Sequence, residues 1–521
     1  MNLVEEKIQQ IAKEIQEANA SPWTVTKIIK ALSEINVSSE KKLREKALEM
    51  LKELDANAAT IYERFSKMKV YNSNETAKGF NRGHIITSLL KETTLSRSVA
   101  EKITLEVENE LKDAKISLLT ASLIRELVNA RLIAYGFEDV RNHYTRAGEP
   151  MYEIAKKLQT APYQGEGVKE YNILLSIPRK ALDIHFEGEI YIEDIEGFSH
   201  RPFAYSIIAQ RKETLEKTVA AATKALMDKR KYFCLPPSIY GLTFACAPFA
   251  KNNSNAKRCA ELIKEMLQIP QKGFAISLEL FTPTALEKFA ADRINATKIS
   301  DELAGEAGTT VCVDSKYCLK IINPKGKNFT ILNNSGEEYF PLNEGLFAPT
   351  QGILLFVNIN LEKIAQTGTE AELFERLAEV AQTVQELKKK KLELLTGKSY
   401  LKEFKPEEMK TAIGLTSLVQ AGENIPGAKT LEFANKLYKE IQKLFPDELL
   451  FGLSSKKAKE KFCEATKKEV HSQEALDFGE CLKEKRCCFI GKAATMKEVN
   501  ELLDNKTKRI EFVGQIATDP Q

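Results

Sequence analysis

The stretch GILLFVNINL, residues 352–361, decides the fold class of this chain. It is a continuous apolar run, and such a run predicts a β-strand that is buried on both faces. A long amphipathic pattern follows soon after it, EAELFERLAEVAQTVQELKKKKLELL, which predicts a helix over residues 370–395. A buried strand followed by a long helix is typical of an α/β fold.

The mixed α/β pattern extends over residues 156–455. Three stretches before residue 352 are predicted as strands, and the last of them reads as a hairpin around Asn334-Ser335-Gly336. Four consecutive lysines in the helical pattern, Lys388–Lys391, are predicted to line a solvated helix face. The candidate strands are FCLPPSIYGLTFA (233–245), GFAISLELF (273–281) and FTILNNSGEEYF (329–340).

Two regions precede this α/β region and one follows it. Residues 1–66 are helical by pattern, with Ile8, Ile11 and Ile15 at helical spacing before the break at Ser21-Pro22. Residues 67–155 are predicted to form a compact unit that ends near Pro150. The tail, residues 456–521, is rich in Lys and Glu and offers at most a helix, KEVNELLDN, and a short strand, RIEFVGQI.

Capping signals divide residues 67–155 into elements. KMKVYN is strand-like, and Ile85 and Leu89 begin the apolar face of a helix. Ser96 and Thr120 suit N-cap positions of two later helices, and Gly136 suits the C′ position of the second. A weak echo links HIITSLLKETTLSRSVAEKI (84–103) to KIIKALSEINVSSEKKLREKA (27–47). It indicates either a degenerate duplication or two amphipathic hairpins of similar pattern.

Composition narrows the class of protein. The 521 residues include 76 basic and 73 acidic side chains, and the net charge of +3 gives no reason to expect a nucleic-acid or membrane partner. No apolar run approaches the length of a membrane span. The nine cysteines are odd in number and irregularly spaced, which is typical of reduced thiols in a cytoplasmic protein. With five histidines and no HExxH or CxxC pair, the sequence proposes no metal site.

The stretch GFNRGHIITSLLKET, residues 79–93, is the first candidate ligand site. A triphosphate needs backbone N–H groups, which a helix N-terminus supplies, and cationic side chains. Gly79 and Gly83 allow close backbone approach. The alternative is an ordinary helix start with solvated cations and a glycine that turns the chain. The cations within reach in sequence are Lys69, Arg82, His84 and Lys91.

The order of elements in this region resembles the ATP-cone, a domain that senses ATP and dATP at the N-terminus of many ribonucleotide reductases. The resemblance implies an effector site that includes Val70, Phe80, Asn81, Arg82, His84 and Ile85, and the nearby Lys69 and Lys91 are predicted to add cations to it. Matches continue at Ser88, Leu89, Ser122, Ile124, Val128, Leu132, Tyr144 and Arg146. The family usually has aspartate in place of Asn81, and a lysine- or arginine-containing turn in place of Tyr71, Asn72 and Ser73.

The resemblance continues beyond the cone. Four segments are similar to anaerobic (class III) ribonucleotide reductases, particularly the archaeal type: RAGEPMYEI (146–154), FEGEIYIEDIEGFSHRPFAYS (186–206), QGILLFVNINLEKIA (351–365) and TAIGLTSLVQA (411–421). The resemblance implies a ten-stranded α/β barrel of the glycyl-radical-enzyme type over residues 156–455. It also implies a homodimer, and an iron–sulfur activase that uses S-adenosylmethionine.

Candidate catalytic residues follow from this resemblance. Cys318, in SKYCLKI, matches the cysteine that becomes a thiyl radical, with Cys312 as the fallback. The alternative for Cys318 is a buried strand cysteine. Gly514 stands near the C-terminus as a radical glycine would, but RIEFVGQI also fits the strand before the family's zinc module.

Three departures weigh against a working enzyme. Tyr191 and Glu193 stand where the family has histidines, and Ala204 stands where archaeal relatives place a cysteine. No CxxC pair precedes Gly514, so the zinc and glycyl-radical module is not evident.

Two functions therefore remain open at the level of sequence. The first is ribonucleoside-triphosphate reduction by thiyl-radical chemistry under ATP/dATP control, with the radical drawn from Gly514 or from a separate glycyl-radical protein. The second is a catalytically inactive paralogue that serves as a nucleotide-sensing regulator or scaffold. A DNA-binding nucleotide sensor is a weaker third, because such a sensor pairs the cone with a zinc ribbon and this sequence shows no ribbon spacing.

Overall fold

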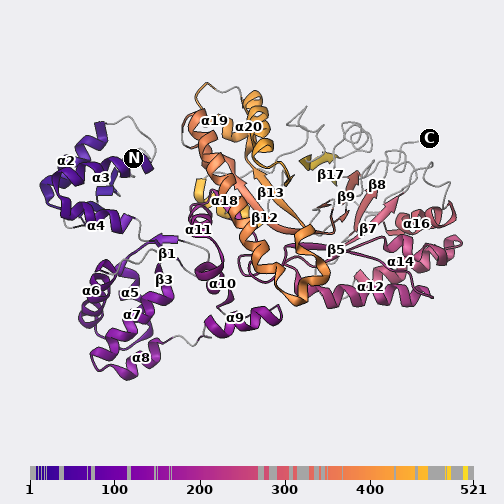
Figure 1. Cartoon of the computed structure of the whole chain (residues 1–521), viewed down its shortest axis with the longest axis horizontal. Helices are drawn as coiled ribbons and strands as arrows, with labels where there is room; N and C mark the ends of the chain where they lie inside the picture. The colour runs from indigo at the N-terminus through magenta and orange to yellow at the C-terminus, as the bar shows by residue number, and fades with distance from the viewer. Residues whose placement is uncertain are drawn as a thin grey trace. The chain divides into compact units, whose positions relative to one another are not determined.

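The computed structural model of the chain forms two compact units, which divide between Gly148 and Glu149. Each unit is described by itself (Figure 1). The described residues are 8, 9, 11, 12, 14–16, 18, 20–34, 40–66, 69–71, 77–113, 119–145, 148, 151–162, 165, 167–267, 275–280, 290–303, 309–313, 328–333, 340, 341, 347, 348, 350–366, 368–427, 430–451, 456–466, 487, 488, 490–493 and 509–513.

Three helices build the first core of the first unit. They are α2 (Pro22–Glu34), α3 (Glu40–Leu54) and α4 (Ala56–Ser66). Pro22 occupies the first position of α2, where its missing N–H costs nothing, and the Ser21 hydroxyl accepts a hydrogen bond from the Thr24 N–H at 3.2 Å. Ile11 and Ile15 are fully buried against these helices, as their spacing predicts.

A small sheet and four helices build the second core of this unit. The sheet has the order β2-β1-β3, with β1 antiparallel to β2 and parallel to β3. Helices α5 to α8 pack around a core that contains Leu89, Val107 and Val128. The bounds are β1 (Lys69–Tyr71), β2 (Ala77–Gly79), α5 (Arg82–Glu92), α6 (Arg97–Asp113), β3 (Leu119–Thr120), α7 (Ala121–Ala134) and α8 (Glu138–Tyr144).

Both caps predicted for α7 are confirmed. The Thr120 hydroxyl accepts a hydrogen bond from the Leu123 N–H at 3.1 Å. At the other end Gly136 has a φ of +74°, and its N–H donates to the Ile133 carbonyl. The Phe137 N–H donates to the Leu132 carbonyl at 2.9 Å, which completes a Schellman motif. Local chemistry therefore fixes where α7 begins and ends.

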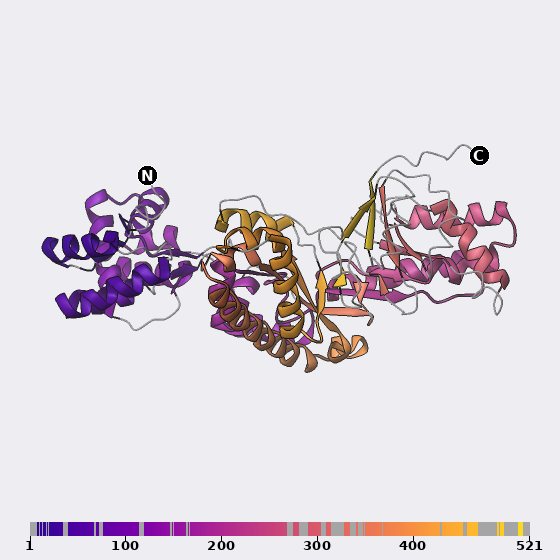
Figure 2. The ribbon, with the colours of Figure 1, turned by 90° about the horizontal axis from the view of Figure 1, so that it is seen from above.

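The second unit is a large sheet with helices packed against it (Figures 1 and 2). Its helical elements up to residue 303 are α9 (Met151–Thr160), α10 (Val168–Tyr171), the π-helix η1 (Asn172–Ser176), α11 (Arg179–Phe186), α12 (Leu215–Lys229), η2 (Arg230–Tyr232), α13 (Leu242–Cys246), η3 (Ala247–Phe249), α14 (Asn253–Leu267) and α16 (Ala290–Leu303). Those that follow are α17 (Leu361–Ala365), α18 (Glu370–Thr396), η6 (Ser399–Phe404), η7 (Pro406–Glu408), α19 (Leu418–Glu423), α20 (Thr430–Leu444) and α21 (Lys456–Thr466).

Two blocks of parallel strands meet edge to edge in this sheet. In the first block β5 to β9 are parallel in chain order, and in the second block β12 to β15 are parallel. The blocks join where β12 runs antiparallel to β5, and β17 with its parallel neighbour β16 adds antiparallel to β9. The strands are β4 (Ile190–Ile192), β5 (Ala204–Ile208), β6 (Ser238–Tyr240), β7 (Ala275–Leu280), β8 (Thr309–Val313), β9 (Asn328–Asn333), β12 (Gly352–Asn360), β13 (Lys410–Thr416), β14 (Leu449–Phe451), β15 (Cys487–Cys488), β16 (Ile490–Ala493) and β17 (Arg509–Val513).

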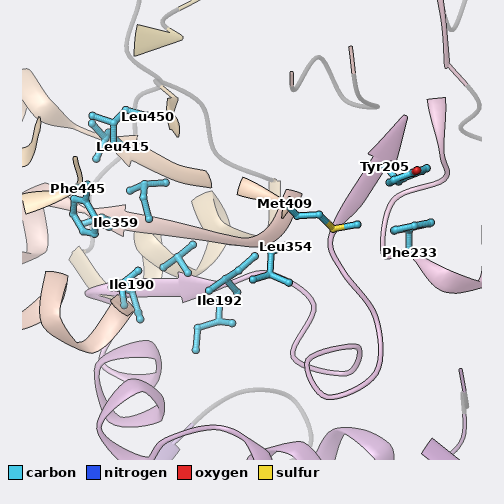
Figure 3. Close-up of a cluster of buried hydrophobic side chains, with 14 of the residues drawn as sticks. Ile190, Ile192, Tyr205, Phe233, Leu354, Ile359, Met409, Leu415, Phe445 and Leu450 are labelled. Atoms are coloured by element: carbon cyan, nitrogen blue, oxygen red, sulfur yellow. The ribbon is translucent and has the colours of Figure 1, made fainter. Parts of the chain in front are cut away.

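The central strand β12 agrees with its prediction, because all nine of its residues are buried. Its start favours Gly352, since a Cβ there would make tight contacts of 3.0 Å with the Ala204 carbonyl oxygen and the Met409 sulfur. Figure 3 shows part of the main apolar cluster around this strand, which includes Ile192 of β4 and Leu354 of β12. The helices α12, α14 and α16 lie beside the first block of strands, and α18 lies beside β12 (Figure 1).

Three predictions in this unit are confirmed only in part. FCLPPSIYGLTFA contributes only the short strand β6, because Gly241 has a φ of +77° and helix α13 follows it. FTILNNSGEEYF is not a hairpin: β9 is flanked by β8 and β17, and β10 (Phe340–Pro341) pairs with β11 (Phe347–Ala348). The solvated face predicted for the four lysines of α18 holds for Lys388, Lys389 and Lys390, which are exposed or partly exposed, but is wrong for Lys391, which is fully buried.

Candidate functional site

The start of α5 has the geometry of a capped helix. The Asn81 side chain accepts a hydrogen bond from the Gly83 N–H at 2.8 Å. A Cβ on Gly83 would lie 2.9 Å from the same Asn81 oxygen, so glycine suits this position. Phe80 and Val70 are half-buried against the core, and Ile85 is buried within it. The apolar members of the predicted effector site therefore anchor the start of α5 by packing against the core of the first unit.

The cations of this helix start face solvent. Arg82 is 65% exposed, and its nearest acid is Glu108, at 3.8 Å between the guanidinium nitrogen and the carboxylate oxygen. The side chains of His84 and Lys91 are exposed as well. Lys69 lies in β1, opposite Gly79 of β2, so its backbone adjoins the same turn. An exposed arginine beside a helix N-terminus is available to an anion at little cost.

A network of hydrogen bonds centred on Arg125 joins the helices α5, α7 and α8. Arg125 of α7 donates to Glu92 of α5 at 2.8 and 3.2 Å, and to the Tyr144 carbonyl of α8 at 2.6 Å. Its guanidinium lies 4.2 Å from the centre of the Tyr144 ring. Hydrogen bonding to Arg125 lowers the pKa of Glu92 even though burial opposes this. The Tyr144 hydroxyl, in turn, lies 3.3 Å from that of Ser88. This network fixes α5 against α7 and α8.

The second candidate region lies where the two strand blocks meet. β4 and β5 pair with different parts of β12, and the chain leaves the sheet between them as the turn Glu193–Phe203. The Glu193 carboxylate accepts from the buried Asn358 amide at 2.7 Å. On the side of Ala204 the sheet carries an apolar cluster. Its members are Phe203, Ala204, Leu235, Ile353, Phe356, Ala412, Leu449 and Phe451, with Cys234 packed against them.

A buried ion pair holds the turn together. Arg201 donates to both carboxylate oxygens of Asp194, at 2.8 and 2.7 Å, and the side chains are only 10% and 5% exposed. The Gly197 N–H donates to the same carboxylate at 3.1 Å, and a Cβ at Gly197 would collide with both partners. Burial opposes ionisation of Asp194, but its bonds to Arg201 outweigh that effect and lower its pKa.

Two further ionisable groups of the turn and of α18 are fully buried. Lys391 of α18 lies with its Nζ 5.3 Å from the centre of the Phe198 ring, and burial lowers its pKa to about 8. Burial, and then the charge of Arg201, lower the pKa of His200 to about 3. Neither the Lys391 amine nor the His200 ring has a hydrogen-bond partner among the described residues. The only signal of this cluster in the sequence is that Lys391 falls on the apolar stripe of α18, four residues before Leu395.

Of the predicted radical residues, only Cys312 lies within the described part of the chain. Cys318 and Gly514 lie outside the described residues. Cys312 lies in β8, where its backbone is opposite Glu279 of β7 and Leu332 of β9. Tyr191, at a position where histidine was expected, is buried against Ala458 and Phe462 of α21. Among the described side chains, no group of three His, Cys, Asp or Glu could hold a metal ion, and none of the described helices combines the length and apolar character of a membrane span.

Comparisons with known proteins place the fold. No family profile and no curated protein sequence matches the chain. The anaerobic ribonucleotide reductase from Thermotoga maritima with citrate in its active site is similar in structure, with a TM-score of 0.50 and 10% identity over 84% of this chain and 99% of that chain. Another anaerobic ribonucleotide reductase has a TM-score of 0.51 and 12% identity over 84% of this chain and 88% of that chain. The structural neighbours of this mixed α/β chain are thus anaerobic ribonucleotide reductases, and the likeness is one of fold.

Proposed function

We propose that the chain is an anaerobic ribonucleoside-triphosphate reductase, which converts ribonucleotides to deoxyribonucleotides under control by ATP and dATP. The observation that carries this proposal is the similarity of fold over 84% of this chain and 99% of the Thermotoga maritima reductase. The antiparallel meeting of two parallel strand blocks supports a ten-stranded barrel of the glycyl-radical-enzyme type.

The reaction assigns each candidate residue a role. Cys318 serves as the thiyl residue that removes the 3′ hydrogen of the ribose, and Cys312 is the fallback. The radical comes from Gly514 or from a separate glycyl-radical protein, after an S-adenosylmethionine-dependent iron–sulfur activase generates it. Stored radicals are needed because closed-shell side chains cannot abstract a hydrogen atom from carbon.

The start of α5 serves as the effector site in this proposal. The helix N-terminus and the exposed Arg82, His84 and Lys91 suit the phosphates of ATP or dATP. Phe80, Val70 and Ile85 support the site from the core. Asn81 caps the helix through its side-chain oxygen, which an aspartate could do equally well, so the departure at this position preserves the cap.

An anaerobic turnover assay tests the catalytic proposal. The full chain is incubated with each ribonucleoside triphosphate, an activase and a thiol or formate reductant, and deoxyribonucleotides are measured by mass spectrometry. We expect product from the wild type and none from Cys318→Ala. Cys463→Ala is the matched control, because Cys463 is a half-buried free thiol of α21, and it should retain activity.

The outcomes separate the two functions. Product that persists in both Cys318→Ala and Cys312→Ala would remove the thiyl assignment. Absence of product from the wild type, together with calorimetric binding of ATP or dATP, would favour the inactive nucleotide-sensing paralogue. Binding that is weakened by Arg82→Ala but not by Arg97→Ala would assign the effector to α5. The two arginines are matched because each is exposed at the first residue of its helix.

A further inference from the structure

The turn Glu193–Phe203 and helix α18 enclose the positive charge of Lys391, which forms no hydrogen bond or ion pair with the described residues. Asp194 is fully committed to Arg201, since both of its oxygens accept from that guanidinium. Lys391 is 0% exposed, and none of the described residues lies within hydrogen-bonding distance of its amine. A buried charge without a partner costs several kcal/mol in proteins.

Burial lowers the pKa of His200 and the charge of Lys391 helps to lower it, so the two groups lie near each other, and His200 also lacks an acceptor among the described residues. His200 is 0% exposed and makes no side-chain hydrogen bond with the described residues, and the buried Ser199 hydroxyl beside it has no partner either. Burial holds the His200 ring in its neutral form, in which one nitrogen is still a donor. The contacts that position His200 are made by its backbone: the Tyr400 hydroxyl donates to its carbonyl at 2.9 Å.

We propose that Lys391 and His200 bind a small inorganic monoanion, of the size and charge of chloride, between α18 and the turn Glu193–Phe203. A negative charge balances the single unpaired cation, and it accepts the hydrogen bonds that Lys391, His200 and Ser199 have to give. The zero exposure of Lys391 and His200 favours an ion without an organic part. The Phe198 ring beneath the Lys391 amine shields the site from water.

The ion would serve as a structural link. Lys391 belongs to helix α18, and His200 belongs to the turn between β4 and β5. An ion held by both residues therefore fixes α18 to the junction of the two strand blocks. This site is separate from the effector site at α5 and does not depend on the proposed function.

Thermal unfolding of the full chain at constant ionic strength tests the proposal. Potassium chloride replaces potassium gluconate stepwise. At each step the melting temperature of the second unit is taken as the temperature at which peptides from β12 and α18 lose their protection from hydrogen exchange. We expect a saturable rise on the order of 1–2 °C in the wild type. Lys391→Met should lose this rise. Lys390→Met is the matched control, because Lys390 is 42% exposed one residue away, and it should keep the rise.

Two results would overturn the proposal: no chloride dependence in the wild type, or the same dependence in all three proteins. Stabilisation by phosphate but not by chloride would also overturn it, because the site would then take a larger oxyanion. If Lys391→Met does not fold, crystals of the wild-type chain grown in bromide decide the matter by anomalous scattering. A bromide peak in contact with the Lys391 amine supports the site, and peaks on the surface alone reject it.

Discussion

The start of α5 and the turn Glu193–Phe203 are both rich in charge, but their environments are opposite. At α5 the cations face water, and Arg82 is 65% exposed with its nearest acid 3.8 Å away. In the turn, Arg201 and Asp194 are almost completely buried and form two short hydrogen bonds. Exposed ion pairs contribute little to stability, whereas removing one partner of a buried pair leaves an isolated charge. We therefore expect the turn to govern stability and the start of α5 to govern binding.

The largest expected effect comes from breaking the buried pair. Asp194→Ala leaves the Arg201 guanidinium buried without its carboxylate, and we expect a loss of about 3–5 kcal/mol in the free energy of unfolding. Urea denaturation followed by hydrogen exchange in β4, β5 and β12 measures it. The control is Glu101→Ala, which removes the exposed partner of Arg97 and should change stability by less than about 0.5 kcal/mol. Equal effects of the two substitutions would erase the contrast between buried and exposed charge.

The next effect has the opposite sign and depends on pH. Lys391→Met removes a buried, unpaired charge, and we expect it to stabilise the second unit by about 1–3 kcal/mol at pH 7 in low chloride. Burial lowers the pKa of Lys391 from 10.5 to about 8. Below pH 8 the folded and unfolded chains both hold the proton, so the cost of the buried charge is fully present.

The same pKa defines the window of pH in which this cost disappears. Between about pH 8 and 10.5 the unfolded chain binds the proton more tightly than the folded chain, so wild-type stability rises with pH. The advantage of Lys391→Met should shrink over this window in a series of urea denaturations. An advantage that stays constant from pH 7 to 10.5 would show that Lys391 does not carry the effect.

A smaller effect is expected in the first unit. Arg125→Ala removes the hydrogen bonds to Glu92 and to the Tyr144 carbonyl, and also the contact with the Tyr144 ring. Because Arg125 is only partly buried, we expect a loss of about 1–2 kcal/mol, read as faster hydrogen exchange in α5, α7 and α8. If Arg125→Ala lowered the free energy of unfolding as much as Asp194→Ala does, the partly exposed network would contribute as much to stability as the buried ion pair, contrary to expectation.

The smallest effect on stability is expected at the effector site. Arg82→Ala should leave the free energy of unfolding within about 0.5 kcal/mol of the wild type, because its side chain is exposed. It should nevertheless weaken ATP or dATP binding by roughly tenfold, the equivalent of one charge-assisted hydrogen bond of about 1.4 kcal/mol. Calorimetric titration measures the affinity. A large loss of stability with unchanged affinity would reverse the assignment of function to this region.

Features that depend on neighbours along the chain can be predicted from the amino-acid sequence. The unbroken apolar run of β12 predicts a strand buried on both faces, and all nine residues are buried. Thr120 and Gly136 predict the ends of α7 because capping uses backbone groups only a few residues away. The apolar stripe of α18 repeats over many turns, so the sequence predicts a helix over residues 370–395. The observed helix spans Glu370–Thr396.

Features that depend on distant partners become visible only in the folded chain. Lys391 stands in a run of four lysines that reads as solvated, but the packing of α18 brings it over Phe198, nearly two hundred residues earlier in the chain. The pairing of Asp194 with Arg201 likewise depends on how the chain turns between β4 and β5. β9 pairs with β8 and β17 rather than folding back on itself, because strand partners are chosen across the whole sheet. Burial and strand order are set by long-range packing, and that packing decides which of the chain's charges are free to bind and which hold the fold.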